Sequence, residues 1–365
     1  MAALIVAYRR YKVAESIAAL ERVNAQLEQI QVYDEQFTAA AAQIDDEKAA
    51  IRLAGVRAMT GLADYWPEHR QACVDVLCAY LRMPHSPNRS QGAPPEDRLK
   101  LDSARDVRDT VLRIITSHLR PGAEVSWRGL DFDFTGVALD DGDFSGVGFA
   151  GGEVSFGGAE FSGGQVSFNG AEFSGGQVSF GGAEFSSGQV SFNGAEFSGG
   201  EVSFGFAAFA GGQLSFNDAE FSGGLVDFRS ARFSGARISF VLAKFPGGRV
   251  SFLLTKFSGG QASFNGAKFS GALVDFSGTR FSGGLVDFFT AEFSGGLVSF
   301  DGAQFTSPVS FLLARFSDGQ VDFSKVADWS QHPNFDGGGT QPSGVRLPTG
   351  SGTSGASEGP TSAGS

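Results

Sequence analysis

The sequence contains few of the residues from which catalytic and metal sites are built. Among 365 residues there are four histidines and two cysteines. Cys73 and Cys78 lie five residues apart in a predicted helix, where they do not share a face, so we expect neither a disulfide nor a metal site, as in a reducing cytoplasm. The histidines lie outside the repeat described below, so the many serines of that repeat lack an evident catalytic base.

A long hydrophobic run and an excess of positive charge are also missing. Residues 1–8 are apolar and the basic pair Arg9-Arg10 follows, whereas a membrane span needs about 20 residues. The segment cannot cross a bilayer as it stands; the alternative is that it is the inner end of a span that starts upstream, with the basic pair as its cytoplasmic flank. The net charge of −12 argues against direct nucleic-acid binding. We expect a cytoplasmic location, or alternatively the inner face of the membrane.

An all-α domain is predicted over residues 14–120, after a separate apolar and basic segment at 1–13. Its helices are expected at Ala14–Phe37, Asp46–Ala63, Pro67–Arg82 and Glu96–Leu119. The first helix is predicted to be long and amphipathic, with Asn24 in an a-like position of a stripe formed by Ile17, Leu20, Leu27 and Ile30.

The rest of the sequence is dominated by a repeat of phenylalanine. The chain has 37 Phe and 52 Gly, and from Phe149 to Phe305 there is a series of phenylalanines separated alternately by seven and five residues. The unit is therefore twelve residues long, and Val or Ala usually stands two residues before each Phe. Because positions i and i−2 share a face in extended chain, both side chains are expected to face an interior.

Two folds can carry such a unit. In the early copies an Asn-Gly pair such as Asn169-Gly170 resembles the turn of a β-hairpin. The later copies have Val241-Leu242, Leu253-Leu254 and Leu312-Leu313 at this position, and such residues resist the positive φ angles of a type I′ turn. We therefore favour a β-solenoid, which needs only a corner there.

Two five-residue segments carry a resemblance to a known family. Ala159-Glu-Phe161-Ser-Gly163 and Val166-Ser-Phe168-Asn-Gly170 resemble the units of pentapeptide-repeat proteins, over about residues 125–329. The resemblance implies a right-handed quadrilateral β-helix, here with 24 residues per coil because two residues are inserted between alternate units, where the family has 20. Residues 34–81 resemble the helical region that precedes such repeats in proteins of actinobacterial type. The predicted fold class is α+β multidomain: an all-α domain followed by this solenoid.

The solenoid is assigned to residues 121–330. At 24 residues per coil it would have roughly eight coils, with Phe156, Phe180 and Phe204 in one stacked ladder. We expect the helical domain to cap one end, and Val326 and Trp329 to cap the other. The tail at 331–365 is rich in Gly, Ser, Thr and Pro and is predicted to be disordered.

The outward charges of the repeat are unevenly distributed along the sequence. Between residues 121 and 220 there are 14 acids and one base; between 221 and 330 there are 8 acids and 10 bases. The residue before alternate phenylalanines shows the change, and these residues are the candidate interaction surface, expected on two opposite faces: Glu160, Glu172, Glu184, Glu196, Arg232, Lys244, Lys256, Lys268 and Arg280. Two explanations of these ladders of like charge stay open: a partner binds them, or duplication of the repeat copied the surface residue and solvent screens its charge.

Exposed apolar residues at the corners are a second candidate surface, which the 24-residue coil would split between two opposite corners. They are Val241, Leu242, Leu253, Leu254, Phe289, Leu312 and Leu313.

These features predict a non-enzymatic scaffold that presents a charged rod to a protein partner, with no cofactor and no metal. The alternative comes from the resemblance: some pentapeptide-repeat proteins mimic DNA and occupy type II topoisomerases such as gyrase. Only the acidic half, up to Glu220, could do so here, and the basic residues from Arg232 to Arg280 oppose it. Members of the family often dimerise through solenoid ends, so a homodimer is a further expectation.

Overall fold

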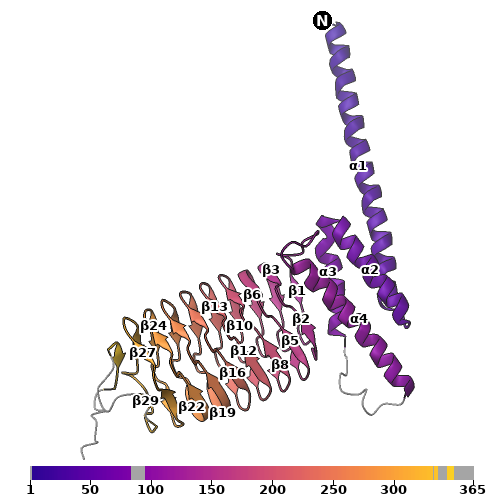
Figure 1. Ribbon diagram of the computed structural model, residues 1–365. Helices are drawn as coiled ribbons and strands as arrows, with labels where there is room; N and C mark the ends of the chain where they lie inside the picture. Colours follow the sequence, from indigo (N-terminus) through magenta and orange to yellow (C-terminus); the bar gives the residue numbers. More distant parts are fainter. Residues whose placement is uncertain (1, 84–94, 332, 336–342, 349–365) are drawn as a thin grey trace, which may run out of the picture. The chain divides into compact units, whose positions relative to one another are not determined.

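The computed structural model describes residues 2–83, 95–331, 333–335 and 343–348. The chain forms two compact units, which are described separately here. The first consists of helices, and the second comprises Arg82–Pro87 and Ile115–Ser365 and contains a parallel β-solenoid of about nine coils. Figure 1 shows both units and confirms the predicted fold class of a helical region followed by a β-solenoid.

In the described residues the helical unit contains four α-helices and one turn of 3-10 helix. They are α1 (Ala2–Ile44), α2 (Ala49–Tyr65), η1 (Pro67–His69), α3 (Arg70–Arg82) and α4 (Pro95–Leu119). Pro67 therefore begins a 3-10 turn, and α3 starts three residues later than predicted. The core is formed by buried residues that recur at helical spacing: Val56, Met59, Cys73, Leu77, Val107 and Val111. Gly55 lets α1 and α2 approach closely, because a Cβ there would lie 2.7 Å from the backbone nitrogen of Ile44.

Helix α1 differs from its prediction in length and in burial. It is continuous from Ala2 to Ile44, so the predicted separate segment at 1–13 and the predicted helix at 14–37 are one helix. The predicted apolar stripe is exposed, with Leu20 at 61% and Leu27 at 59%, and burial begins only at Tyr33. No helix within the described residues is both long enough and apolar enough to span a membrane.

The solenoid contains two parallel sheets, called A and B here. Sheet A consists of β1 (Phe132–Asp133), β3 (Gly148–Ser155), β6 (Glu172–Ser179), β9 (Glu196–Phe197), β10 (Glu201–Ser203), β13 (Glu220–Phe221), β14 (Leu225–Asp227), β17 (Lys244–Phe245), β18 (Arg249–Ser251), β20 (Lys268–Phe269), β21 (Leu273–Asp275), β23 (Glu292–Phe293), β24 (Leu297–Ser299), β27 (Arg315–Phe316), β28 (Gln320–Asp322) and β30 (Val345–Arg346).

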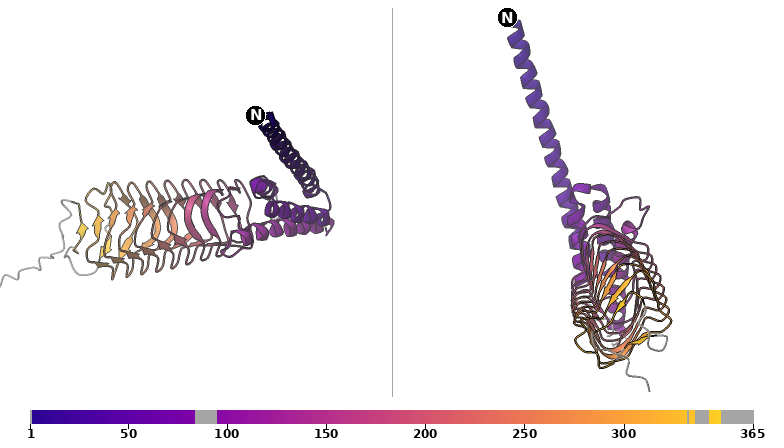
Figure 2. Two further views of the ribbon diagram at one scale, coloured as in Figure 1. Left: turned by 90° about the horizontal axis from the view of Figure 1, so that it is seen from above. Right: turned by 90° about the vertical axis from the view of Figure 1, so that its left-hand side faces the viewer.

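Sheet B consists of β2 (Gly142–Asp143), β4 (Glu160–Phe161), β5 (Gln165–Ser167), β7 (Glu184–Phe185), β8 (Gln189–Ser191), β11 (Ala208–Phe209), β12 (Gln213–Ser215), β15 (Arg232–Phe233), β16 (Arg237–Ser239), β19 (Lys256–Ser263), β22 (Arg280–Asp287), β25 (Gln304–Phe305), β26 (Val309–Phe311) and β29 (Asn334–Phe335). Partner residues through the central coils are 24 apart, as Val202 and Val226 are, which confirms the predicted coil length. Figure 2 shows the coils from the side and nearly along their stack.

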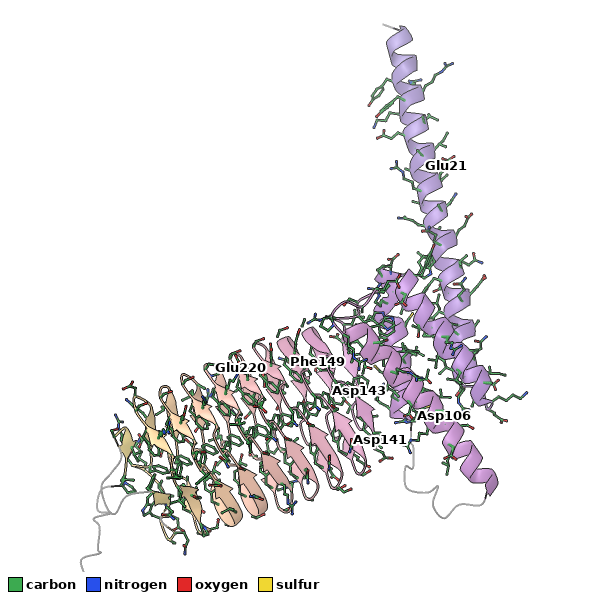
Figure 3. All side chains as sticks on the ribbon, in the orientation of Figure 1. Glu21, Asp106, Asp141, Asp143, Phe149 and Glu220 are labelled. Atoms are coloured by element: carbon green, nitrogen blue, oxygen red, sulfur yellow. The ribbon has the colours of Figure 1, made fainter. Side chains whose placement is uncertain are left out.

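Phenylalanine ladders form the core of the solenoid. The ring of Phe180 stacks on Phe156 with centroids 4.8 Å apart and on Phe204 with centroids 4.7 Å apart, as predicted. Neighbouring ladders meet edge to face, as Phe168 does with Phe180 at 86°. The Val or Ala two residues before each ring is also buried, so each strand turns alternate side chains inward. Figure 3 shows side chains filling the interior of the coils.

The corners of the coils correct one premise of the sequence argument. Leu242, Leu254 and Leu313 have φ angles of 59°, 59° and 56°, so these leucines do adopt the left-handed conformation that we expected them to resist. The strand pairs among the described residues are nevertheless parallel, which excludes the hairpin for these corners and confirms the solenoid. This corner position therefore has a positive φ whichever residue occupies it. In the next coils it is occupied by Gly266 and Gly278, which adopt a positive φ easily.

The C-terminal end of the solenoid extends into the predicted tail. Strands β29 and β30 lie beyond residue 330, the ring of Phe335 stacks on Phe311 with centroids 5.2 Å apart, and Val345 is buried. The assignment of 331–365 to a disordered tail is therefore wrong for residues 334–335 and 345–346. Trp329 meets the rings of Phe305 and Phe323 edge to face, as expected for a residue near the end. The remaining tail predictions concern residues 332, 336–342 and 349–365, which lie outside the described residues.

Candidate functional site

The nine predicted surface residues fall on the two sheets, as the coil length requires. Four belong to the sheet-A ladder, whose rungs are Gly148, Glu172, Glu196, Glu220, Lys244, Lys268, Glu292 and Arg315. Five belong to the sheet-B ladder, whose rungs are Glu160, Glu184, Ala208, Arg232, Lys256, Arg280 and Gln304. A rung is the residue that one coil contributes to a ladder, and successive rungs are about 4.8 Å apart, which is the spacing between neighbouring strands.

The sheet-A ladder is largely neutralised within the molecule. Lys244 Nζ lies 3.7 Å from a carboxylate oxygen of Glu220. Glu292 lies between two cations, with Lys268 Nζ at 3.7 Å and Arg315 Nη1 at 3.6 Å. Each pair is exposed and therefore contributes only about 0.2–1 kcal/mol. These pairs matter more for the electrostatic potential of this face than for stability, because each pair places a positive charge next to a negative one.

Arg128 completes the sheet-A ladder and was missed by the sequence reasoning. Its Nη2 donates to a carboxylate oxygen of Glu172 at 3.0 Å, and its Nε donates to the carbonyl oxygen of Gly148 at 3.3 Å. The guanidinium occupies the space of a Gly148 side chain, because a Cβ there would lie 2.1 Å from Nη2. The only signal in the sequence was that Gly replaces the usual charged residue at position 148.

The sheet-B ladder lacks such neutralisation. In the described part of the chain, none of its five charged side chains forms an ion pair within 4.0 Å; these residues are Glu160, Glu184, Arg232, Lys256 and Arg280. All five are exposed, and Lys256 is stacked directly between Arg232 and Arg280. Like charges directly opposite each other on neighbouring strands are destabilising. The arrangement therefore lowers stability and leaves an acidic and a basic segment facing solvent.

A shallow polar groove runs beside the sheet-B ladder across four coils. It has a volume of about 550 Å³ and is lined by Gly164, Gln165, Gly188, Gln189, Gly212, Gln213, Gly235 and Arg237. The glutamines and Arg237 are successive rungs of one ladder, five residues after the charged ladder in each coil. Sheet B thus offers amide donors and acceptors next to its charges.

The apolar corner residues are divided between two corners of the coil, as predicted. Leu242 and Leu313 lie at the corner that follows sheet B strands and are 50% and 57% exposed, whereas Leu254 lies at the other corner and is 53% exposed. The remaining predicted corner residues, Val241, Leu253, Phe289 and Leu312, are half-buried. Phe206, which is 62% exposed, shares the corner of Leu254 and was not predicted. Neither corner forms a continuous apolar surface, because Asn265 and Arg229 occupy this position in intervening coils.

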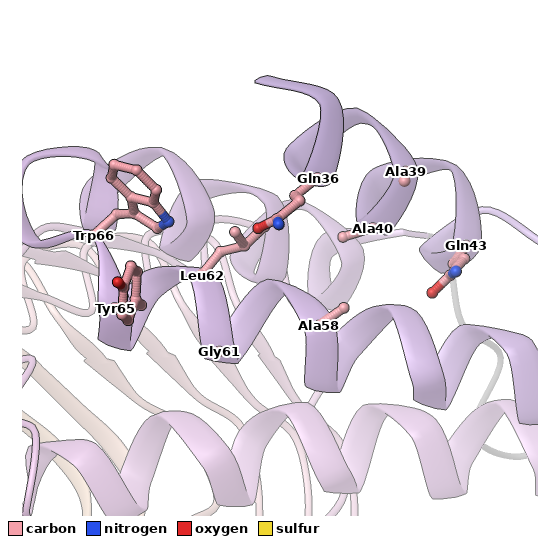
Figure 4. Close-up of a pocket in the computed structure, with 9 residues that line it drawn as sticks. All are labelled: Gln36, Ala39, Ala40, Gln43, Ala58, Gly61, Leu62, Tyr65 and Trp66. Carbon is pink, nitrogen blue, oxygen red and sulfur yellow. The ribbon is translucent and has the colours of Figure 1, made fainter. Parts of the chain in front are cut away.

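The helical unit contains an apolar cleft between α1 and α2, drawn in Figure 4. It has a volume of about 390 Å³ and is lined by Gln36, Ala39, Ala40, Gln43, Ala58, Gly61, Leu62, Tyr65 and Trp66. Nearby, Tyr33 Oη lies 3.6 Å from Cys73 Sγ, and burial raises the pKa of both groups. A buried thiol with a raised pKa is a weak nucleophile. Among the described residues, no group of three or more His, Cys, Asp or Glu is placed to hold a metal ion.

Carboxylates near both ends of the solenoid are held by arginines. Burial tends to raise the pKa of Asp143, but hydrogen bonds from Ser145 and the nearby Arg120 guanidinium outweigh burial and lower it. Asp322 behaves in the same way, with Ser324 and Arg346 as partners. These ion pairs are structural, because each joins a strand to a neighbouring segment at a solenoid end.

Comparison of the chain with protein-family models, with curated proteins and with solved structures found no match.

Proposed function

We propose that this chain is a non-enzymatic interaction scaffold of pentapeptide-repeat type, with a right-handed quadrilateral coil, and that its binding surface is sheet B. The observation that carries the proposal is the difference between the two ladders. The sheet-A ladder is largely matched internally, with Glu196 as the exception and with Glu220 beside Lys244, whereas Lys256 is stacked between two arginines. A partner with complementary charges would relieve the repulsion that the free surface retains.

The alternative of DNA mimicry gains no specific support. Glu172 is bound by Arg128, which reduces the acidic character of sheet A where mimicry would need it. Basic rungs begin at Arg232, in the middle of the rod. A protein surface with both signs of charge is the partner that fits sheet B best.

The proposal can be tested by photo-crosslinking in cells that make the protein. A photoreactive residue replaces Ser258, which is exposed on sheet B next to Phe257 and leaves every charged rung in place. The matched control is Ser270, which is exposed after Phe269 on sheet A. We expect protein adducts from position 258 and few from position 270, with the adducts at 258 reduced when Arg232→Glu is added. Equal adducts from both positions, or none from 258, would refute an interaction role for sheet B.

A further inference from the structure

The sheet-B ladder reverses its charge symmetrically about Ala208. Glu184 and Glu160 lie one and two coils before Ala208, and Arg232 and Lys256 lie one and two coils after it. Figure 1 shows the neighbouring sheet-B strands β5, β8, β12, β16, β19 and β22 in one row. If a second copy of this ladder is turned end to end and placed opposite the first, each of these acidic rungs therefore lies opposite a basic rung.

The third level is less regular. Arg280 lies three coils after Ala208, whereas the rung three coils before Ala208 is the uncharged Ala138, which pairs with Glu160. Asp140 and Asp141 follow Ala138 on the same coil, where Asp140 accepts a hydrogen bond from Ser162 Oγ at 3.1 Å and Asp141 accepts one from the Gln165 backbone at 2.9 Å. Acidic side chains are thus present on each of the three levels before Ala208, but on the third level they lie beside the charged ladder.

We propose that sheet B binds sheet B of a second copy of this chain, with the two rods antiparallel and a two-fold axis crossing the face at Ala208. This inference rests on the proposed function of sheet B and names its partner. A two-fold axis perpendicular to the rods places each ladder opposite the same ladder of the second copy, with the order of its rungs reversed. Glu184 then faces Arg232 of the second copy and Glu160 faces Lys256, each contact occurring twice, while Arg280 faces the rung of Ala138, with Asp140 and Asp141 beside it.

A second copy fits this face better than an unrelated partner for two reasons. Its rungs have the same spacing, about 4.8 Å, so the charged rungs on the two levels next to Ala208 can match at once. The ladder from the rung of Ala138 to that of Arg280 is about 29 Å long, and a second copy presents a complementary ladder of the same length.

The rungs near the axis also fit this arrangement. Ala208 would face Ala208, so no like charges meet at the centre. In the ladder beside it, Gln213 would face Gln213 and Gln189 would face Arg237, where amides and a guanidinium can form hydrogen bonds. The sheet-A ladder is less suitable, because a two-fold axis between its Glu220 and Lys244 would place Glu172 opposite Glu292 and would compete with the ion pairs already formed there.

The test is the mass of the full-length protein by sedimentation velocity over a range of concentrations, in 20 mM and 500 mM NaCl. We expect a dimer at low salt and a monomer at high salt, because the contacts are exposed ion pairs. Glu184→Arg alone and Arg232→Glu alone should each weaken the dimer about tenfold or more, because two like-charge contacts replace two ion pairs. The double variant restores opposite charges at both contacts and should return to within about threefold of the original dissociation constant.

The matched control is Glu196→Arg, which makes the same charge change on sheet A and should leave the dimer unchanged. A protein that is monomeric at low salt at every concentration, or a dimer that Glu184→Arg does not weaken, would overturn the proposal; the latter result would point to another surface, such as the exposed stripe of α1. If the chain is monomeric but position 258 crosslinks a different protein, the homodimer fails and the scaffold function stands. If the chain is monomeric and position 258 gives no adduct, both fail.

Discussion

Lys256→Glu is expected to stabilise the solenoid, although it reverses a charge on a regular repeat. In the structure Lys256 is an exposed rung directly between Arg232 and Arg280. Cross-strand charge pairs contribute roughly 0.2–1 kcal/mol each, favourable or unfavourable by sign. The substitution changes two repulsive neighbours into two attractive ones, so after allowing for solvent screening we expect a gain of about 1 kcal/mol. For a unit of this size that corresponds to a rise in Tm of about 2–4 °C.

Thermal unfolding followed by circular dichroism measures this effect, at the lowest workable protein concentration so that association does not contribute. The rise should shrink to below about 1 °C in 0.5 M salt, because the charges are exposed. Lys244→Glu is the matched control: it replaces the attraction to Glu220 by repulsion and the repulsion from Lys268 by attraction, so its net effect should be near zero. A fall in Tm for Lys256→Glu, or equal shifts for both variants, would refute the view that the sheet-B ladder is strained by its own charges.

Other substitutions test the core, the corners, the helical unit and the solenoid end. Phe216→Ala removes a fully buried ring from a ladder and should cost about 3–5 kcal/mol, measurable by urea unfolding. Leu254→Asn should be neutral or stabilising by up to about 1 kcal/mol in the same assay, because Asn tolerates the φ of 59° better, whereas a clear loss would show that the leucine side chain matters more than its backbone. Cys73 is buried and its pKa is raised, so a thiol reagent at neutral pH should label it only as fast as the helical unit opens, which mass spectrometry can follow against urea. Arg120→Ala should lower stability by roughly 0.5 kcal/mol at pH 7, and because the pKa of Asp143 is lowered in the folded state, this difference should disappear as the pH falls below about 4.

The solenoid could be predicted from the sequence because its signal is repeated in every coil. The alternation of seven and five residues between phenylalanines fixes the 24-residue coil, and the coil length then fixes which residues stack, such as Phe156 on Phe180. The same arithmetic placed the charged residues on two sheets. Where the repeat weakens, prediction failed: Phe335 and Val345 pair with Phe311 and Val321 at the regular distance of 24 residues, but the alternation of phenylalanines does not continue there, so their segment was taken for a disordered tail.

Features that depend on a single contact could not be predicted. The partner of Glu172 is Arg128, which is 44 residues away and outside the regular repeat, so no spacing rule connects them. The positive φ of Leu254 was missed because intrinsic preference argues against it, and the packing of the neighbouring coils overrides that preference. The stripe on α1 has helical spacing, but spacing alone does not show whether a stripe is covered, and Leu20 is exposed.

The pattern of variation within the repeat bears on whether the sheet-B charges were merely copied. Simple copying would keep the same residue, but Arg232, Lys256 and Arg280 are two residue types with one charge. The residue before each of them also changes, from Ala231 to Thr255, and the threonine hydroxyl donates to the carbonyl oxygen of Phe228 at 2.8 Å. These copies have therefore diverged at neighbouring positions while the sign of the charge stayed the same, despite the repulsion that it causes. Such a pattern is expected if the positive charge of this segment is used, and an acidic surface with the same 4.8 Å spacing, such as the other half of this face, is what would use it.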